Sequence, residues 1–166
     1  MAKKIDPLNR KRYAPVSAML TVSDIKAAAS FYQKAFGFTK RGIMSGPDGK
    51  AIHAELILRG TTLMLNPEMP QMGSRSAKNV GASPVWMYLL TENVDKVIKK
   101  AVQLGAEAKG PVKDMFWGDR VGNLADPDGY MWMIATHIDD PTPAQMKKRM
   151  KEQMAAGHPD GGPSGA

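Results

Sequence analysis

The 166-residue chain contains no cysteine. This absence excludes disulfide bonds, zinc sites built from thiolates and cysteine nucleophiles. No apolar run approaches the roughly 18 residues that a membrane-spanning helix needs, and the basic N-terminal residues are not followed by the apolar segment of a secretory signal. We therefore expect a cytoplasmic protein that has no membrane partner.

Sequence motifs of two large enzyme groups are also missing. The chain has neither a G-x-S-x-G nucleophile elbow nor a G-x-x-x-x-G-K phosphate loop. These absences exclude a hydrolase of the elbow type and a P-loop nucleotide hydrolase. Histidine is scarce, and the three histidines are His53, His137 and His158.

Positive charge exceeds negative charge, because the chain has 23 lysine and arginine residues against 16 aspartate and glutamate residues. A net charge of +7 raises the question of a nucleic-acid partner. The excess is concentrated in residues 1–13, which hold five basic residues and one acidic residue, whereas residues 14–138 are nearly balanced. We therefore interpret residues 1–13 as a flexible, solubilising leader and expect no nucleic-acid partner.

Hydrophobic patterning divides the rest of the chain into two similar halves. In residues 14–66, apolar side chains spaced three and four apart predict a helix over residues 25–36. Asp24 before it and Gly37 after it are typical of the two ends of a helix. Four further segments predict strands, at 16–22, 40–44, 51–59 and 61–65, the last two joined by a tight turn at Arg59 and Gly60.

The same order of elements returns in residues 84–138. A strand at 84–90 precedes a helix that ends at Gly105, 68 residues after Gly37, and the last strands are predicted at 107–116, 119–125 and 130–136. Residues 67–83, rich in proline, glycine and serine, predict a linker. The two β-α-β-β-β modules are each too small to bury a sheet face alone. They predict one α+β domain with an eight-stranded, cup-like sheet.

The C-terminal residues differ in character from both modules. Residues 139–155 predict an amphipathic helix, with Met146, Met150 and Met154 on one face and lysines on the other. Residues 156–166 are rich in glycine and proline and predict a disordered tail.

Local motifs relate the chain to a known group of proteins. These motifs are TVSD at 21–24, FYQKAFGF at 31–38, FWGDR at 116–120, DPDGY at 126–130 and ATH at 135–137. Over residues 14–155 the chain resembles the vicinal oxygen chelate superfamily, the group of glyoxalase I, bleomycin-resistance proteins and extradiol dioxygenases. Within it, the closing motifs resemble the PhnB-like glyoxalase-like set. The resemblance implies a homodimer, in which the methionine stripe of the C-terminal helix could form the interface.

The resemblance also implies where a metal would bind. Superfamily chemistry usually rests on one divalent metal held by histidine, glutamine or glutamate side chains from the first and last strands of each module. Carried over to this chain, these positions are Ser17, Met64, Trp86 and Met133. Divalent cations prefer nitrogen and oxygen ligands to thioether and indole groups. We therefore expect no metal and no cofactor, and an apolar cup in which these four residues bind a small molecule.

Four other residues are candidates for ligand binding. His53 and Glu55 lie two apart on a predicted strand and therefore share a face of the sheet. Their alternative role is an outward polar pair balanced by a nearby basic residue. Trp117 is suited to stacking on a planar ligand, and Arg120 to binding a carboxylate or phosphate. The alternatives for this segment are aromatic packing on the sheet and an ion pair of Asp119 or Arg120 that fixes a loop.

Three functions fit these observations, and we favour the first. It is metal-independent binding or sequestration of a small apolar or aromatic molecule, similar to bleomycin resistance. The second is an enzyme of unassigned activity that uses His53, Glu55, Asp119 or Arg120 without the usual metal. This second alternative includes a metal-dependent lyase or dioxygenase if the motif alignment is wrong. The third is an interaction protein whose cup is filled by its own core.

Overall fold

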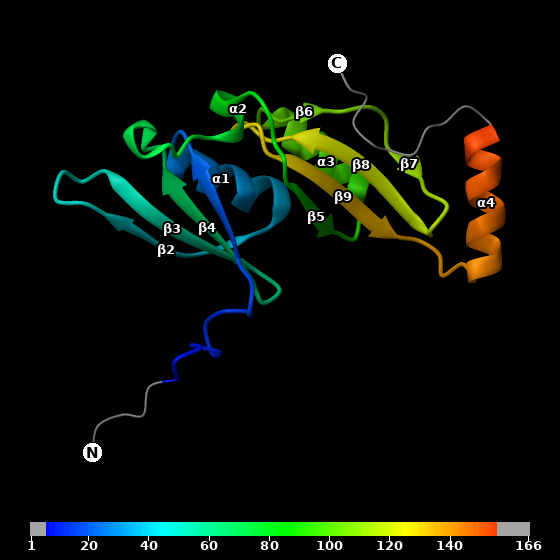
Figure 1. The fold of residues 1–166 in the computed structure, drawn as a ribbon, viewed down its shortest axis with the longest axis horizontal. Helices are drawn as coiled ribbons and strands as arrows, with labels where there is room; N and C mark the ends of the chain where they lie inside the picture. The colour runs from blue at the N-terminus through cyan, green and yellow to red at the C-terminus, as the bar shows by residue number, and fades with distance from the viewer. Residues whose placement is uncertain (1–5, 156–166) are drawn as a thin grey trace.

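The computed structural model describes residues 6–155; the predicted tail at 156–166 and residues 1–5 of the leader lie outside these residues. Two modules follow one another along the chain (Figure 1). The first consists of β1 (Ala18–Val22), α1 (Ile25–Phe36), β2 (Thr39–Ser45), β3 (Ala51–Leu58) and β4 (Thr61–Pro67). The second consists of β5 (Trp86–Leu90), α3 (Val94–Gln103), β6 (Glu107–Ala108), β7 (Lys113–Asp114), β8 (Asp119–Ala125) and β9 (Met131–His137).

The first module has the predicted order, and both ends of its helix are confirmed. Oδ1 of Asp24 accepts a hydrogen bond from the backbone N–H of Ala27 at 2.9 Å, which caps the start of α1. Gly37 ends α1 with a φ of 78°, a left-handed conformation that favours glycine. The spatial order of the strands is β1-β4-β3-β2, with β1 parallel to β4 and the other pairs antiparallel.

The second module repeats this arrangement with one difference. Its strands have the order β5-β9-β8-β6, and β7 also pairs with β8. The single strand predicted over residues 107–116 is wrong, because this segment forms the two short strands β6 and β7. Gly110, with a φ of 95°, and Pro111 separate them. Proline has no N–H for the sheet ladder, and the left-handed glycine turns the chain, so a continuous strand cannot form.

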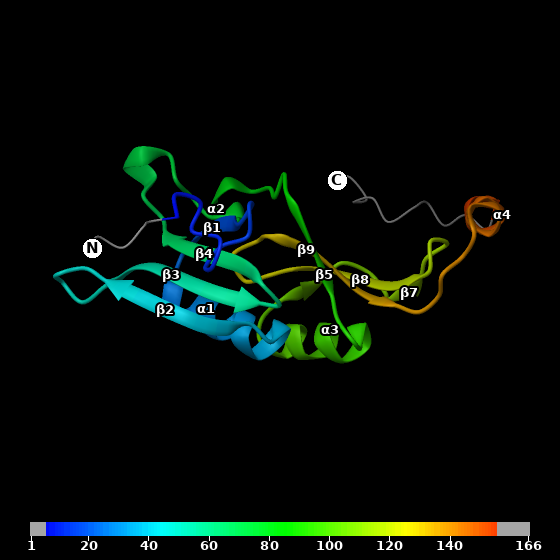
Figure 2. The ribbon, with the colours of Figure 1, turned by 90° about the horizontal axis from the view of Figure 1, so that it is seen from below.

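The strands form two sheets, one from each module, rather than the single eight-stranded sheet that we expected, while the α+β class and the two modules are confirmed. Helices α1 and α3 lie next to each other on the same side of the sheets (Figure 2). Alternate side chains of a strand point to opposite faces. Each sheet therefore has one face packed on its helix and another that we call its open face. The helix side holds the core, including Leu20, Leu56, Leu65, Leu124 and Ile134.

The turn between β8 and β9 joins the two modules. The buried carboxylate of Asp126 accepts hydrogen bonds from the Tyr32 hydroxyl of α1 at 2.6 Å and from the Trp132 indole at 2.8 Å. Asp128 accepts hydrogen bonds from the backbone N–H and the hydroxyl of Ser23 at 2.8 and 2.7 Å. Both acidic groups of the DPDG motif are thus used to hold the first module against the second.

The linker expected at residues 67–83 contains short ordered elements. The last residue of β4 lies in it, and a 3₁₀ turn, η1 (Pro70–Met72), and a helical turn, α2 (Ala77–Val80), follow. Glu68 accepts a hydrogen bond from the backbone N–H of Ser76 at 2.7 Å. The side chain of Ser76 in turn accepts a hydrogen bond from the backbone N–H of Asn79 and caps the start of α2. These two side-chain-to-backbone contacts hold the segment in place.

The predicted C-terminal helix is present as α4 (Pro143–Ala155), beyond the outer end of the second sheet (Figure 1). Arg149 forms an ion pair with Asp139 at 2.7 Å, and Gln153 donates a hydrogen bond to the carbonyl of Asp114 at 3.0 Å. The three methionines of its apolar stripe are not buried. Within residues 6–155, none of the helices has the length and apolar character needed to cross a lipid bilayer.

Candidate functional site

The open face of the first sheet carries most of the candidate residues. Strand pairing places Glu55 between Gly42 and Met64, and it places His53 opposite Met44. Large apolar side chains are exposed on this open face, where 57% of Met19 and 60% of Met44 are accessible to solvent. Methionines left uncovered this far on a sheet face are typical of a binding surface rather than of a core.

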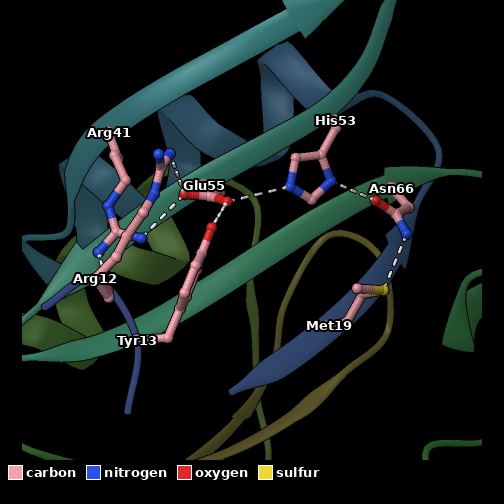
Figure 3. A network of polar contacts seen from close by, with 7 residues as sticks. All are labelled: Arg12, Tyr13, Met19, Arg41, His53, Glu55 and Asn66. Carbon is pink, nitrogen blue, oxygen red and sulfur yellow. Dashed lines mark hydrogen bonds and ion pairs between the residues drawn. The ribbon is translucent and has the colours of Figure 1, made fainter. Parts of the chain in front are cut away.

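Glu55 is the centre of a polar cluster on this face (Figure 3). Its Oε1 accepts a hydrogen bond from the Tyr13 hydroxyl at 2.5 Å. Its Oε2 accepts hydrogen bonds from Arg12 Nη2 at 3.1 Å and from Arg41 Nη1 at 3.0 Å. The guanidinium of Arg41 also lies over the Tyr13 ring, 5.1 Å from its centroid. One carboxylate therefore gathers two leader residues and one residue of β2.

The ionisation of Glu55 follows from these contacts. Burial alone would raise the pKa of its carboxyl, but the hydrogen bonds from Tyr13, Arg41 and Arg12 outweigh burial and lower the pKa to about 2. The carboxylate is therefore charged at neutral pH and holds the end of the leader against the sheet. The sequence interpretation of residues 1–13 as a solvated leader did not include this attachment.

His53 lies beside Glu55, as the spacing of the two residues predicted. Its Nδ1 is 2.7 Å from Asn66 Oδ1, and its Nε2 is 3.7 Å from Glu55 Oε1. Asn66 Nδ2 donates to the sulfur of Met19 at 3.0 Å, which leaves its oxygen to accept from Nδ1–H of His53 (Figure 3). A proton on Nδ1 therefore fits the hydrogen bond with Asn66.

A pocket of about 170 Å³ opens to solvent at this cluster. The lining residues are Arg12, Gly42, Ile43, Met44, His53 and Glu55. The pocket is smaller than a site for a drug-sized ligand, but its lining combines apolar surface with a few convergent polar groups, as small-molecule sites do. The pocket was not predicted from the sequence, although two of its residues, His53 and Glu55, were.

A second polar cluster lies on the open face of the second sheet. Asp119 accepts hydrogen bonds from the Tyr88 hydroxyl at 2.5 Å, from the Trp117 indole at 2.9 Å and from His137 Nδ1 at 2.8 Å. The hydrogen bond to Asp119, and a weaker contact with Asp140, raise the pKa of His137. Both carboxylate oxygens of Asp119 thus accept hydrogen bonds, and the cluster ties β5, β8 and β9 together.

The four positions that the resemblance assigned to a metal lie on the two sheets in pairs. On the first sheet, Ser17 directly precedes β1, and Met64 of β4 pairs with Met19 of β1. On the second sheet, Trp86 lies on β5, and Met133 of β9 pairs with Tyr88 of β5. A hydroxyl, two thioethers and an indole do not fit a hard or borderline divalent cation. Over residues 6–155, no group of three or more histidine, aspartate or glutamate side chains is arranged so that it could hold a metal ion.

Trp117 and Arg120 occupy positions that favour their structural alternatives. Trp117 packs edge-on against Phe116, with ring centroids 4.9 Å apart, and its indole N–H is used by Asp119. Arg120 pairs with Asp95 of α3 at 2.9 Å and with Asp114 of β7 at 2.7 Å. Its guanidinium therefore connects a helix to a strand and is already matched by two carboxylates.

Three residues of the site, Arg12, Tyr13 and Arg41, were missed by sequence reasoning. Arg12 and Tyr13 lie more than 40 positions before Glu55, so only the folded chain brings them together. Arg41 depends on a feature of strand pairing. The pairing of β2 with β3 shifts between Lys40 and Gly42, and Arg41, which lies at this bulge, donates to Glu55.

Comparison with known proteins places the chain in a family. Residues 14–134 match the family described as the glyoxalase/bleomycin resistance protein/dioxygenase superfamily. This match extends across both modules. The chain belongs to this superfamily. The Glu55 cluster and its pocket are therefore features of a glyoxalase-fold protein.

Relatives in sequence support the same assignment. The chain is 36% identical over 141 residues to an uncharacterized protein of Mycobacterium bovis, an alignment that covers 83% of this chain and 93% of the relative. It is 27% identical over 125 residues to a putative glyoxylase of the same species, named CFP32, covering 72% of this chain and 45% of the relative.

Solved structures agree with the fold of this superfamily member. A gene product of Arabidopsis thaliana is 25% identical and superposes with a TM-score of 0.60, covering 74% of this chain and 98% of that chain. A glyoxalase/bleomycin resistance protein/dioxygenase family enzyme of Burkholderia phytofirmans is 19% identical, with a TM-score of 0.60 and coverage of 74% and 97%. The second likeness bears on the fold alone.

Proposed function

We propose that this superfamily member binds a small apolar or aromatic molecule on the open face of its first sheet, without a metal. The observation that carries the proposal is the open pocket of about 170 Å³ beside Glu55, whose wall includes the exposed Met44. Methionine side chains are flexible and polarisable, and they adapt to apolar ligands. Binding or sequestration similar to bleomycin resistance is the function that this arrangement supports best, and the closing motifs suggest a member of the PhnB-like set.

The chemistry of the family's metal positions supports the metal-independent part of the proposal. Ser17, Met64, Trp86 and Met133 offer one oxygen, two thioether sulfurs and no imidazole or carboxylate. Elemental analysis of the purified protein tests this directly. We expect no stoichiometric nickel, zinc, iron or manganese, and one equivalent of any of these metals would refute it.

Ligand binding is tested with a neutral fluorescent probe, N-phenyl-1-naphthylamine, together with native mass spectrometry for a co-purified molecule. The variant Met44→Gln keeps the size of the side chain but adds an amide to the pocket wall. We expect it to weaken probe binding by about fivefold, because about 1 kcal/mol of apolar contact is lost. Met72→Gln is the matched control, since Met72 is 72% exposed and does not line the pocket. Equal effects of the two substitutions would contradict the proposed site.

A second candidate function is an enzyme that uses His53 as a general base. The specific observation in its favour is that Asn66 fixes one ring nitrogen of His53 while the ring lines the pocket. The test incubates the protein with a small-molecule extract and follows the consumption of single components by mass spectrometry. Consumption by the natural protein that His53→Gln abolishes would favour the enzyme, whereas binding without consumption would favour sequestration.

A further inference from the structure

The polar cluster of Glu55, which borders the pocket, is not electrically neutral. Two guanidinium groups, those of Arg12 and Arg41, contact a single carboxylate, that of Glu55. Of these three residues, Arg12 and Glu55 line the pocket; its remaining lining residues are Gly42, Ile43, Met44 and His53, and none of them is acidic. The cluster therefore carries an excess of one positive charge even with His53 neutral, and this excess lies at the edge of an apolar pocket.

The two arginines differ in how fully they are used. Both guanidinium groups lie over the Tyr13 ring, that of Arg41 at 5.1 Å and that of Arg12 at 5.6 Å from its centroid. The Arg41 side chain is only 18% exposed, and it also donates from Nη2 to the carbonyl of Arg12 at 2.7 Å. The Arg12 side chain is 53% exposed and lines the pocket, and within residues 6–155 it donates one hydrogen bond, from Nη2 to Glu55. The other edge of its planar guanidinium is left for an acceptor outside the protein, and a carboxylate matches that edge with two parallel hydrogen bonds.

The rest of the pocket suits the body of such a ligand rather than its charge. Met44 and Ile43 supply apolar wall, and Gly42, which pairs with Glu55, leaves open space where a side chain would otherwise stand, since a Cβ there would meet no atom within 4 Å. A ligand with an apolar or aromatic body and one carboxylate would place the body on Met44 and the charge at Arg12. A purely ionic ligand would leave the methionine uncovered.

We propose that the pocket beside Glu55 takes an apolar or aromatic monocarboxylate, whose charge is bound by the guanidinium of Arg12. This inference deepens the proposed function and rests on it, because it names the class of molecule that the same face would bind. It also gives the leader a role. Arg12 belongs to residues 1–13, so a bound carboxylate would add a second anchor, besides Glu55, for the end of the leader.

The test compares two probes of equal size, 2-naphthoate and its neutral amide, 2-naphthamide, by titration of the full chain in NMR or calorimetry at low salt. We expect 2-naphthoate to bind at least about fivefold more tightly, as one partly exposed, bidentate ion pair allows. Arg12→Gln should remove this preference. Arg10→Gln is the matched control, because Arg10 belongs to the same leader and has the same charge but pairs with Asp6 and does not line the pocket.

Each outcome decides between the inference and the function on which it rests. If 2-naphthamide binds as tightly as 2-naphthoate, the carboxylate inference is wrong while binding on this face stands. If neither probe binds at millimolar concentration, both are wrong. A preference that survives in Arg12→Gln, or is lost equally in Arg10→Gln, would also overturn the inference. Should Arg12→Gln unfold, the natural protein alone gives the answer: the preference must fall as salt is raised, since screening weakens an exposed ion pair.

Discussion

The hydrogen bond between Tyr32 and Asp126 allows a sharp test of how the two modules are held together. Tyr32 is 1% exposed on α1 of the first module, and Asp126 is 5% exposed in the turn of the second. The substitution Tyr32→Phe removes the hydroxyl alone. The ring still packs on Phe36 and Trp132, whose centroids lie 5.9 and 5.6 Å away, so any loss of stability reports the hydrogen bond.

The expected magnitude follows from burial. A hydrogen bond to a charged group that is removed on one side only costs about 1.5–3 kcal/mol when water cannot replace it. Asp126 keeps the Trp132 indole and the backbone N–H groups of Asp128 and Tyr130 as donors, which places the cost near the middle of the range. We expect a loss of about 2 kcal/mol in the free energy of unfolding, which lowers the urea midpoint by about 1 M for a domain of this size.

Tyr88→Phe is a matched control. Tyr88 also donates its hydroxyl to a carboxylate, that of Asp119, at 2.5 Å, but Tyr88 is 51% exposed. Water can take the place of its hydroxyl, so the same chemical change should cost less than about 1 kcal/mol. Urea unfolding followed by circular dichroism gives the free energy of unfolding of both variants. If the dependence of this free energy on urea concentration is unchanged, each variant unfolds in the same way as the natural protein.

A pH series adds a second readout. Burial is the main cause that raises the pKa of Asp126, and the hydrogen bond from Tyr32 opposes it. Tyr32→Phe therefore raises this pKa further, so that the folded variant binds a proton more readily than the natural protein. The difference in the free energy of unfolding between the natural protein and Tyr32→Phe must then become smaller as pH falls through the pKa of Asp126. A cost for Tyr32→Phe no larger than that for Tyr88→Phe, or a difference that grows in acid, would refute the reasoning.

Three further predictions concern other parts of the chain. Because the pKa of Glu55 is lowered from 4.5 to about 2, its contribution to stability is present above pH 4.5 and is lost as pH falls toward 2; urea unfolding of Glu55→Gln should lack this acid dependence. Gly118→Ala should cost about 3 kcal/mol or more, since φ is 99° and a Cβ would overlap the carbonyl of Asp139, whereas Gly37→Ala, with open space around it, should cost about 1 kcal/mol in the same assay. Deletion of residues 141–166 should reduce the mass found by light scattering if the methionine stripe of α4 forms a dimer, and an unchanged mass would count against that role.

Local sequence signals predicted the elements well where a single residue type decides the backbone. Asp24 and Gly37 mark the ends of α1, and Arg59 and Gly60, both with positive φ, form the predicted tight turn between β3 and β4. The same kind of signal was overlooked at Gly110, next to a proline, and there the predicted strand is interrupted. These features depend on neighbours in sequence, which is why the sequence alone can reveal them.

The candidate site was predictable only in part, because most of it depends on tertiary contacts. Period-two alternation places His53 and Glu55 on one face, and the structure has them there. Alternation cannot say that Arg12 and Tyr13 of the leader return to Glu55, nor that Arg120 meets Asp95 and Asp114. Charged residues were found by their type, but their partners were set by tertiary packing within each module and by the return of the leader to the first sheet.

The two modules repeat each other in pattern but not in chemistry, and this difference locates the site. Glu55 pairs with Met64 on the first sheet as Asn123 pairs with Met133 on the second. At the first position an acid collects Tyr13 and two arginines beside an open pocket. At the second position an amide stands, and its oxygen is buried without a partner among the described residues. An amide carries no charge with which to attract arginines. The cluster of two arginines around one carboxylate therefore has no counterpart at the equivalent position of the second sheet, and the first sheet is where we expect a ligand recognised by its charge to bind.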